Sequence, residues 1–265
     1  MNKPMILLTN DDGIASPGLM AAAEALMPLG KLVVAAPITQ QTSMGRAYTG
    51  DPEARFERYS LTVGGVAVEA YSCDASPAAV VRHAFLALPH CNPALVVAGI
   101  NYGENIGANV TGSGTVGATL EAAARGVPAL AMSLETDIAS HREYTEQDWS
   151  GSAYFTRFFA EGILRKGMPP GVQILKIEVP SDATEKTPWR MTRLSPFSYY
   201  ECSVPNPGLE CRRCETVFTK RSGVGEPSDT DAYAIRTARA VAVTPLSIDI
   251  TASTPLNVVS AWVEK

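Results

Sequence analysis

The chain has 265 residues, a net charge of −5 and a hydrophobic content of 46%. This length and apolar content are sufficient for one large α/β domain with its own core, which excludes a disordered chain. The excess of acidic over basic residues argues against a nucleic-acid polymer as the main partner. Small phosphorylated ligands remain compatible with it. Only Lys3 precedes the first apolar run, and no stretch approaches a membrane span, so we expect no signal sequence, no membrane segment and a cytoplasmic location.

Short apolar runs rich in β-branched residues alternate with helical patterns along the chain. Such alternation is typical of a doubly wound α/β fold, in which a mostly parallel sheet carries helices on both faces. The runs that we predict as strands are 5–8, 31–35, 94–98, 128–133 and 172–179.

Three helices are predicted in the first half of the chain. The first covers 17–29, where Ala, Leu and Met recur at helical spacing after Ser16 as the N-cap. The others cover 77–88, which begins with a Ser-Pro pair, and 115–125, which Gly126 ends. The first strand and the helix over 17–29 thus form a clearly marked βα unit.

The composition changes after about residue 180. Prolines, a Tyr199-Tyr200 pair and many turn residues continue to about residue 229, and we interpret 181–229 as strands and an extended arm outside the main sheet. A strand is then predicted over 238–245 and a short terminal helix over 255–263. The sequence has no internal repeat. From its length and apolar content we treat 1–265 as a single domain.

The first predicted strand ends in Asn10-Asp11-Asp12-Gly13. In an open α/β sheet ligands bind at the carboxyl ends of strands, where two adjacent carboxylates repel each other unless a cation lies between them. No His or Cys is near, so the ligands would be oxygen atoms, which favour Mg²⁺ or Mn²⁺ over zinc. The alternative is a turn rich in Asn and Asp that caps the next helix. The segment by itself leaves both interpretations open.

A glycine-rich stretch follows the strand predicted at 94–98. It contains Gly99-Ile100-Asn101 and then Thr111-Gly112-Ser113-Gly114-Thr115 at the start of a helix. Backbone N–H groups and the positive end of the helix dipole make such a segment a phosphate site. Its spacing resembles a P-loop, but Ala118 stands where the phosphate-binding lysine would be, which argues against an NTPase. The alternative is a flexible glycine loop followed by an N-cap.

The polar loop 37–46 follows the second predicted strand, at the same edge of the sheet as Asp11. Either Thr42 or Ser43 could complete a metal shell, and Arg46 could neutralise phosphate charge. Polar loops after strands are common, so this signal is weak alone.

The residue inventory disfavours several other chemistries. There is no Gly-x-Ser-x-Gly motif, and no His lies in the candidate loops to activate a serine. The first βα turn is acidic where a dinucleotide site needs glycines. The five cysteines include one close pair, Cys211 and Cys214, which is too few for structural zinc and indicates free thiols or a local disulfide.

Together these motifs resemble the survival protein SurE family of metal-dependent nucleotide phosphatases. They follow one another in the family's order over most of the chain. The matching segments are 6–14 with Pro17-Gly18-Leu19, Ala36-Pro37 with its polar loop, Gly99-Ile100-Asn101, Ser113-Gly114-Thr115-Val116, and Thr244-Pro245-Leu246 with Asp249.

The resemblance implies the site residues and the activity. Asp11, Asp12, Asn101 and the hydroxyl of Thr42 or Ser43 would hold one divalent ion per subunit, Mg²⁺ or Mn²⁺, and the first three would be catalytic. The phosphate would lie among Asn10, Ser113, Gly114 and Thr115. The expected enzyme is a 5′-nucleotidase that hydrolyses nucleoside 5′- and 3′-monophosphates; the alternatives are an exopolyphosphatase and a non-catalytic nucleotide-binding protein.

The resemblance also implies a homodimer or homotetramer whose C-terminal elements reach across to a neighbour, a role for the arm at 181–229 and the final helix. The chain departs from the family's pattern at several positions. Thr42 stands where the family usually has the metal-binding serine, and Ala79 stands where an acid is usual. Lys176 and Glu178 replace two asparagines of a strand. None of these changes removes a predicted metal ligand.

Overall fold

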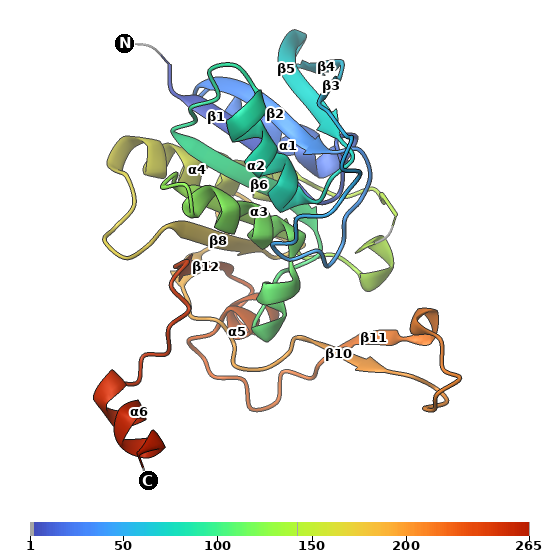
Figure 1. Ribbon diagram of the computed structural model, residues 1–265, viewed down its shortest axis with the longest axis vertical. Coiled ribbons are helices and arrows are strands. Elements are labelled where there is room, and N and C mark those ends of the chain that lie inside the picture. The colour runs from blue at the N-terminus through green and yellow to red at the C-terminus, as the bar shows by residue number, and fades with distance from the viewer. Residues whose placement is uncertain (1–2, 142, 265) are drawn as a thin grey trace.

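Residues 3–141 and 143–264 are described by a computed structural model. Figure 1 shows a central twisted sheet with helices against it, and a hairpin and a terminal helix that project from this body. Among the described residues, no helix combines the length and the apolar composition that a membrane crossing needs.

The central sheet is mostly parallel, which confirms the predicted fold class. Strands β5, β2, β1, β6, β7 and β8 run parallel to one another, whereas β3 and β4 are antiparallel to β5 and β12 is antiparallel to β8. In spatial order the strands are β3 (Glu57–Arg58), β5 (Val66–Cys73), β2 (Lys31–Pro37), β1 (Met5–Thr9), β6 (Leu95–Tyr102), β7 (Ala129–Leu134), β8 (Ile174–Val179), β12 (Val241–Leu246) and β9 (Trp189–Met191), and β4 (Leu61–Val63) pairs with β5.

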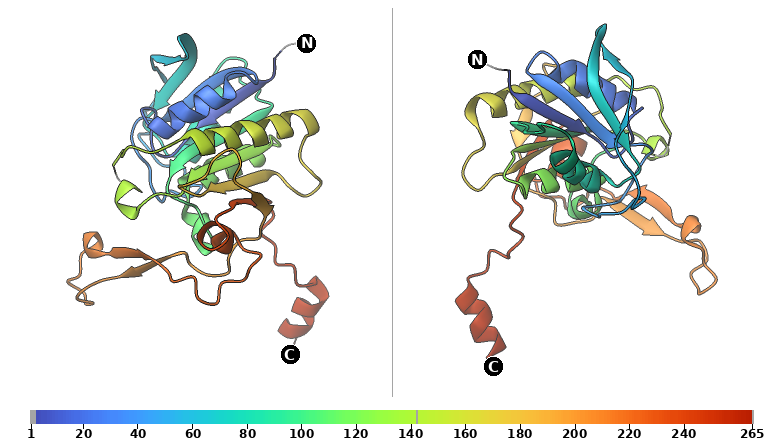
Figure 2. Two further views of the ribbon diagram at one scale, coloured as in Figure 1. Left: turned by 180° about the vertical axis from the view of Figure 1, so that it is seen from behind. Right: turned by 45° about the horizontal axis from the view of Figure 1, so that its top comes forward.

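Helices cover both faces of the sheet (Figure 2). Helices α1 (Pro17–Leu26) and α4 (Ser150–Lys166) pack on one face, and α2 (Pro77–Ala87) and α3 (Gly114–Ala123) pack on the other. Successive side chains of a strand point to opposite faces, so Ile6 and Leu8 join the first hydrophobic cluster and Leu7 joins the second. Because both faces of the central strands are buried, their sequences are continuous apolar runs.

The predicted elements form with small changes in their ends. Helices α1 and α3 stop earlier than expected, at Leu26 and Ala123, and β6 continues past the predicted 98 to Tyr102. The strand predicted over 238–245 is β12, and the terminal helix is α6 (Leu256–Val263).

One expectation about the C-terminal half was wrong in part. Trp189–Met191 lies within 181–229 but joins the main sheet, because it pairs in parallel with β12 at the edge. A three-residue edge strand has too little alternation to be recognised in the sequence. The part that does lie outside the sheet is the hairpin of β10 (Tyr200–Ser203) and β11 (Val217–Lys220), with the short η3 (Arg213–Glu215) between them.

A buried ion cluster joins β8 to helix α5 (Asp231–Arg236). The Lys176 Nζ lies 3.2 Å from Glu178 Oε1 and 3.1 Å from Asp231 Oδ2, and all three side chains are fully buried. Burial raises the pKa of Glu178 to about 7, although the charge of Lys176 opposes this. The backbone N–H groups of Asn105 and Gly107 donate to the two carboxylates. The segment after β6 is therefore held against β8 and α5.

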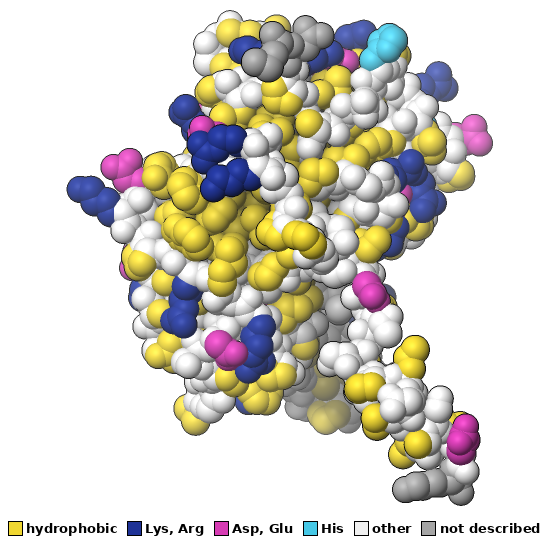
Figure 3. All heavy atoms as spheres, turned by 90° about the vertical axis from the view of Figure 1, so that its left-hand side faces the viewer, with side chains coloured by type: hydrophobic (Ala, Val, Ile, Leu, Met, Phe, Trp, Pro, Cys, Tyr) yellow, Lys and Arg dark blue, Asp and Glu magenta, His cyan; other side chains and the backbone are white. Residues whose placement is uncertain are grey.

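Helix α6 has no buried residue. It follows an extended segment after β12 and stands apart from the body, with apolar side chains along it (Figure 3). Leu256, Trp262 and Val263 are about three-quarters exposed.

Candidate functional site

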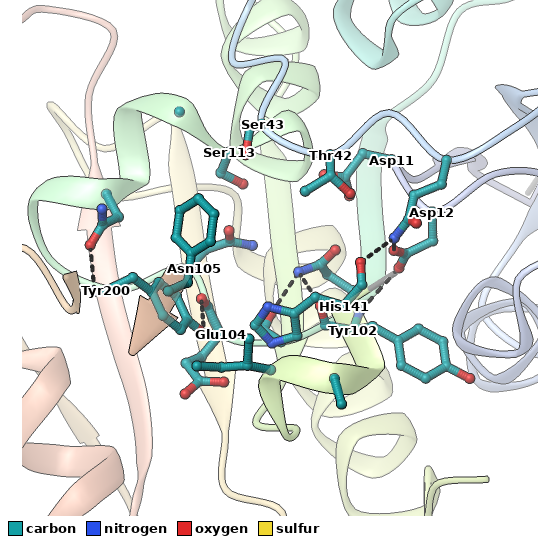
Figure 4. A pocket seen from close by; sticks show the side chains of 18 of the residues that line it. Asp11, Asp12, Thr42, Ser43, Tyr102, Glu104, Asn105, Ser113, His141 and Tyr200 are labelled. Atoms are coloured by element: carbon teal, nitrogen blue, oxygen red, sulfur yellow. Dashed lines mark hydrogen bonds between the residues drawn. The ribbon is translucent and has the colours of Figure 1, made fainter. Parts of the chain in front are cut away.

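A cavity of about 470 Å³ opens at the carboxyl ends of β1 and β6, next to the start of α3. This is the edge at which ligands bind in open α/β sheets. Figure 4 shows Asp11, Asp12, Thr42 and Ser43 on one side, and His141, Glu104 and Tyr200 on another. The predicted site residues that line it are Asp11, Asp12, Thr42, Ser43, Asn101 and Ser113.

The turn after β1 is fixed by its own hydrogen bonds. Asn10 Nδ2 donates to Gly13 O at 2.9 Å, and Gly13 N donates to Asn10 Oδ1 at 3.2 Å. Gly13 has φ +100°, and a Cβ there would lie 3.1 Å from the carbonyl carbon of Thr39, so only glycine fits without strain. Asn10 is fully buried within this turn and does not line the cavity. The turn rich in Asn and Asp is thus present and carries the two carboxylates, but it does not cap the next helix, whose N-cap is Ser16.

Asp11 lies against the first turn of α3. Its Oδ1 accepts a hydrogen bond from the Thr115 hydroxyl at 2.5 Å, and the backbone N–H groups of Gly114 and Thr115 also reach it. Burial raises the pKa of Asp11, and these hydrogen bonds limit the rise. A Cβ on Gly114 would lie 2.7 Å from Asp11 Oδ2. Gly114 and Thr115 therefore face Asp11, whereas Ser113 lines the cavity and accepts from Val116 N as the N-cap of α3.

Asp12 is held by groups from two other elements. Tyr102 N donates to its Oδ2 at 3.0 Å, and Gln40 Nε2 donates to its Oδ1 at 3.1 Å. Only 2% of its surface is exposed. Burial, and next the negative charge of Asp11, raise the pKa of Asp12 to about 8. Without a cation, the two carboxylates cannot both ionise cheaply at neutral pH.

Asn101 enters the site through an irregularity in β6. The register between β6 and β7 shifts between Ala98 and Asn101, and such a bulge re-aims the side chains beyond it. The Asn101 Nδ2 donates to the carbonyls of Tyr102 and Gly103 at 3.2 and 2.6 Å. Its side-chain oxygen remains available as an acceptor at the cavity.

The loop after β2 brings both candidate hydroxyl residues to the cavity, so the choice between Thr42 and Ser43 stays a prediction. Gln41 N donates to Asp11 O at 2.6 Å, and Gly45 N donates to Gly112 O at 2.9 Å. A Cβ on Gly117 of α3 would lie 1.9 Å from Gly45 O, so this close approach requires glycine.

The sequence suggested that Arg46 neutralises the charge of the phosphate, but the structure places this side chain elsewhere. Its Nη2 lies 2.9 Å from Glu121 Oε2 on α3, and the Tyr48 hydroxyl donates to the same oxygen. Arg82 and Arg125 bind the other oxygen at 3.1 and 3.2 Å. Burial alone would raise the pKa of Glu121, but these hydrogen bonds lower it below the usual value. Arg46 and Tyr48 therefore hold the hydroxyl-bearing loop on α3 rather than reaching a ligand.

Among the described residues that line the cavity there is no lysine or arginine. Within 3–141 and 143–264 there is also no group of three or more His, Cys, Asp and Glu side chains placed to hold a metal. The acidic end therefore offers two carboxylates supplemented by hydroxyl and amide oxygens. A phosphate could approach these carboxylates only with a cation between them.

Sequence reasoning missed the other end of the cavity. It is formed by η2 (Ile138–His141) and by one face of the β10–β11 hairpin. The two hairpin strands have four residues each and no apolar alternation, so nothing in the sequence marks the face that lines the cavity.

The family model described as "Survival protein SurE" matches residues 6–201 of this chain. The protein named 5′-nucleotidase SurE from Thermococcus gammatolerans is 40% identical over 248 residues, which cover 93% of this chain and 91% of that protein. The protein of the same name from Rubrobacter xylanophilus is 35% identical, with coverage of 97% and 96%. The crystal structure of the SurE protein from Aquifex aeolicus superposes with a TM-score of 0.77 at 27% identity and covers 99% of this chain and all of that one.

Glu121→Gln should loosen the loop that carries Thr42 and Ser43, because the amide accepts more weakly and leaves three arginines without a counter-charge. We expect the free energy of unfolding to fall by roughly 1–3 kcal/mol, since Glu121 is buried but its partners are partly exposed. Amide hydrogen exchange should accelerate in 41–48. Arg125→Met is the matched control, since it removes a partner of Glu121 that does not belong to the loop. Equal exchange in the loop for both variants would contradict this role.

Proposed function

Because the chain belongs to the survival protein SurE family, as the match over residues 6–201 shows, we propose that it is a metal-dependent phosphomonoesterase. It hydrolyses nucleoside 5′- and 3′-monophosphates to nucleoside and phosphate. The relatives named 5′-nucleotidase SurE align over nearly the whole chain, which supports this activity. The observation that carries the proposal is the pair of buried carboxylates, Asp11 and Asp12, at a cavity whose described lining holds no lysine or arginine.

The donor set fits one divalent ion per subunit. Burial and the charge of Asp11 raise the pKa of Asp12 to about 8, so ionising this side chain costs free energy. A cation between the two carboxylates would reduce that cost. Asp11, Asp12, Asn101 and the hydroxyl of Thr42 or Ser43 would hold it. All of these donors are oxygen atoms, which suit Mg²⁺ or Mn²⁺. When bound, the ion supplies Lewis-acid polarisation of the phosphoryl group and a lower pKa for water.

The residues of the chain position the reactants. Thr115 and the first N–H groups of α3 hold Asp11, while Tyr102 and Gln40 hold Asp12, so neither carboxylate needs to reorganise during the reaction. Ser113 lies at the cavity, where its hydroxyl can contact the phosphate. Water attacks phosphorus in line with the leaving nucleoside oxygen. One of the two carboxylates accepts the proton of that water, and a solvent water donates a proton to the leaving oxygen as its bond to phosphorus breaks.

We also propose that the protein assembles as a homodimer or homotetramer in which the C-terminal helix contacts a neighbour. Helix α6 exposes Leu256, Val259 and Trp262 to water, and it is joined to the body by an extended segment. An apolar helix without a covering surface is unfavourable in water. A second copy of the chain would bury it, and the projecting hairpin could take part in the same contact.

Phosphate release from nucleoside monophosphates should require Mg²⁺ or Mn²⁺ and should stop with a chelator. Asp12→Asn keeps the shape but removes a charge, and we expect it to lower kcat about 100-fold or more. Asp148→Asn is the control, since that carboxylate is exposed and does not line the cavity. Short polyphosphate in the same assay tests the exopolyphosphatase alternative. A folded protein that releases no phosphate with any metal would refute the proposed activity.

Metal should stabilise the protein more at pH 8 than at pH 5. The pKa of Asp12 in the metal-free fold is about 8 against the usual 3.8, so this group destabilises the fold increasingly as the pH rises through that window. A divalent ion relieves the repulsion, and at pH 5 it must first displace a proton. Melting temperatures with Mn²⁺ and with chelator at the two pH values measure this. In Asp12→Asn, the rise in melting temperature caused by Mn²⁺ should differ less between the two pH values. If the difference were as large as in the wild type, Asp12 would not be the group responsible.

Trp262→Asp should shift the mass measured by light scattering toward the monomer, because the exposed ring of α6 would no longer be buried by a neighbour. Leu86→Asp is the control, as this side chain is equally exposed on α2. A wild-type protein that is already monomeric, or an unchanged mass in Trp262→Asp, would refute the proposed contact.

A further inference from the structure

The cavity has two chemically different ends, of which the proposed hydrolysis uses one. Asp11, Asp12, Thr42 and Ser113 lie at the acidic end. The other end carries larger and less polar side chains, contributed by Ile138, Tyr200, Cys202, Thr216 and Phe218. Figure 4 shows Tyr200 on the side of the cavity away from Asp12. A volume of about 470 Å³ lies within the range of small-molecule sites and exceeds the need of a phosphate alone.

One face of the hairpin forms this wall. Cys202 pairs with Phe218, and Tyr200 pairs with Lys220. Side chains two apart on a strand share a face, so Tyr200 and Cys202 of β10 lie on the same face as Thr216 and Phe218 at β11. All four line the cavity, whereas the intervening Glu201 and Val217 do not. The alternation of side chains along each strand thus determines which hairpin residues line the cavity.

The hairpin is attached to residues of the site itself. Lys220 Nζ lies 2.6 Å from Glu104 Oε1 and donates to Thr136 O at 2.9 Å. At the other strand, the backbone N–H groups of Tyr199 and Tyr200 donate to Asn109 Oδ1 at 2.6 and 3.0 Å. Glu104 and Asn109 both line the cavity. The base of the hairpin therefore has a defined position relative to the acidic end.

Phe218 is the aromatic side chain best placed on this wall to meet a ligand. It lines the cavity, yet 43% of its surface is exposed. Among the described residues, no aromatic ring or cation packs against its ring, whereas the nearby Phe197 has Arg221 over it at 3.9 Å. An open ring at a cavity offers a face on which a planar heteroaromatic group can stack.

We propose that this hairpin face is the subsite for the base of the nucleotide, with Phe218 as the stacking surface. The inference rests on the proposed function, since it assigns the leaving nucleoside to the less polar end while the phosphate lies at Asp11 and Asp12. Stacking tolerates any base because every base has a π-face. The subsite therefore selects nucleotides over phosphate esters that lack a base, and it discriminates weakly among bases.

The test compares adenosine 5′-monophosphate with ribose 5-phosphate, which has the same ester but no base. In Phe218→Ala, we expect the ratio of their kcat/KM values to fall about 10-fold, mainly through KM for the nucleotide. Phe218→Trp should restore the ratio, because it keeps a stacking surface. Val217→Ala is the control on the opposite face of the same strand and should leave both values unchanged.

Two outcomes would overturn the subsite. Equal losses of kcat/KM on both substrates in Phe218→Ala would show that the ring supports the fold alone, and unchanged kcat/KM values on both substrates would show that the base does not contact it. Calorimetric titration of adenosine 5′-monophosphate with Mn²⁺ separates this result from failure of the proposed function. If the wild type hydrolyses neither ester but Phe218→Ala weakens nucleotide binding about 10-fold, the subsite stands and the proposed activity falls. If binding is also unchanged, the subsite is refuted.

Discussion

The site depends on the repulsion between two neighbouring carboxylates that the fold buries together. Asp11 and Asp12 follow a fully buried strand, so the chain cannot turn them into bulk water without pulling β1 out of the sheet. Their charges must be compensated where they lie. Part of the compensation comes from the hydroxyl of Thr115 and from backbone N–H groups. In the function that we propose, a bound cation supplies the rest. The surrounding elements are held in place by contacts with this acidic turn and with one another.

Three elements are held to the acidic turn by contacts that do not themselves involve a ligand. Helix α3 approaches through Gly114 and Thr115, the loop after β2 is bound to α3 through Glu121 and the close approach at Gly117, and β6 contributes Asn101 beyond a bulge. Most of these contacts use backbone atoms or buried side chains. The oxygen donors are therefore positioned before any ion or substrate arrives, which reduces the cost of binding and reaction.

The acidic end could be predicted from the sequence because its information is local. An apolar run followed by Asp11 and Asp12, and another followed by Asn101, place polar groups at one edge of a parallel sheet. The partner of Arg46 could not be predicted, since charge alone does not say which of many carboxylates lies nearby in the fold. The hairpin face was missed for a similar reason. Cys202 and Phe218 are paired by strand register across a long connection, and the sequence carries no marker of that register.

The ion cluster of Lys176, Glu178 and Asp231 restricts how this part of the chain can evolve. The first two residues lie in β8, where they place opposite charges in the protein interior. A single step would leave a buried charge without its partner, which costs roughly 3–5 kcal/mol, whereas exchange of the whole set can be nearly neutral. These positions are therefore epistatic: each accepts substitution only when its neighbours change with it. Since the cluster also holds Asn105 and Gly107, and Asn105 lines the cavity, a substitution in the cluster would disturb the cavity as well as the buried strand.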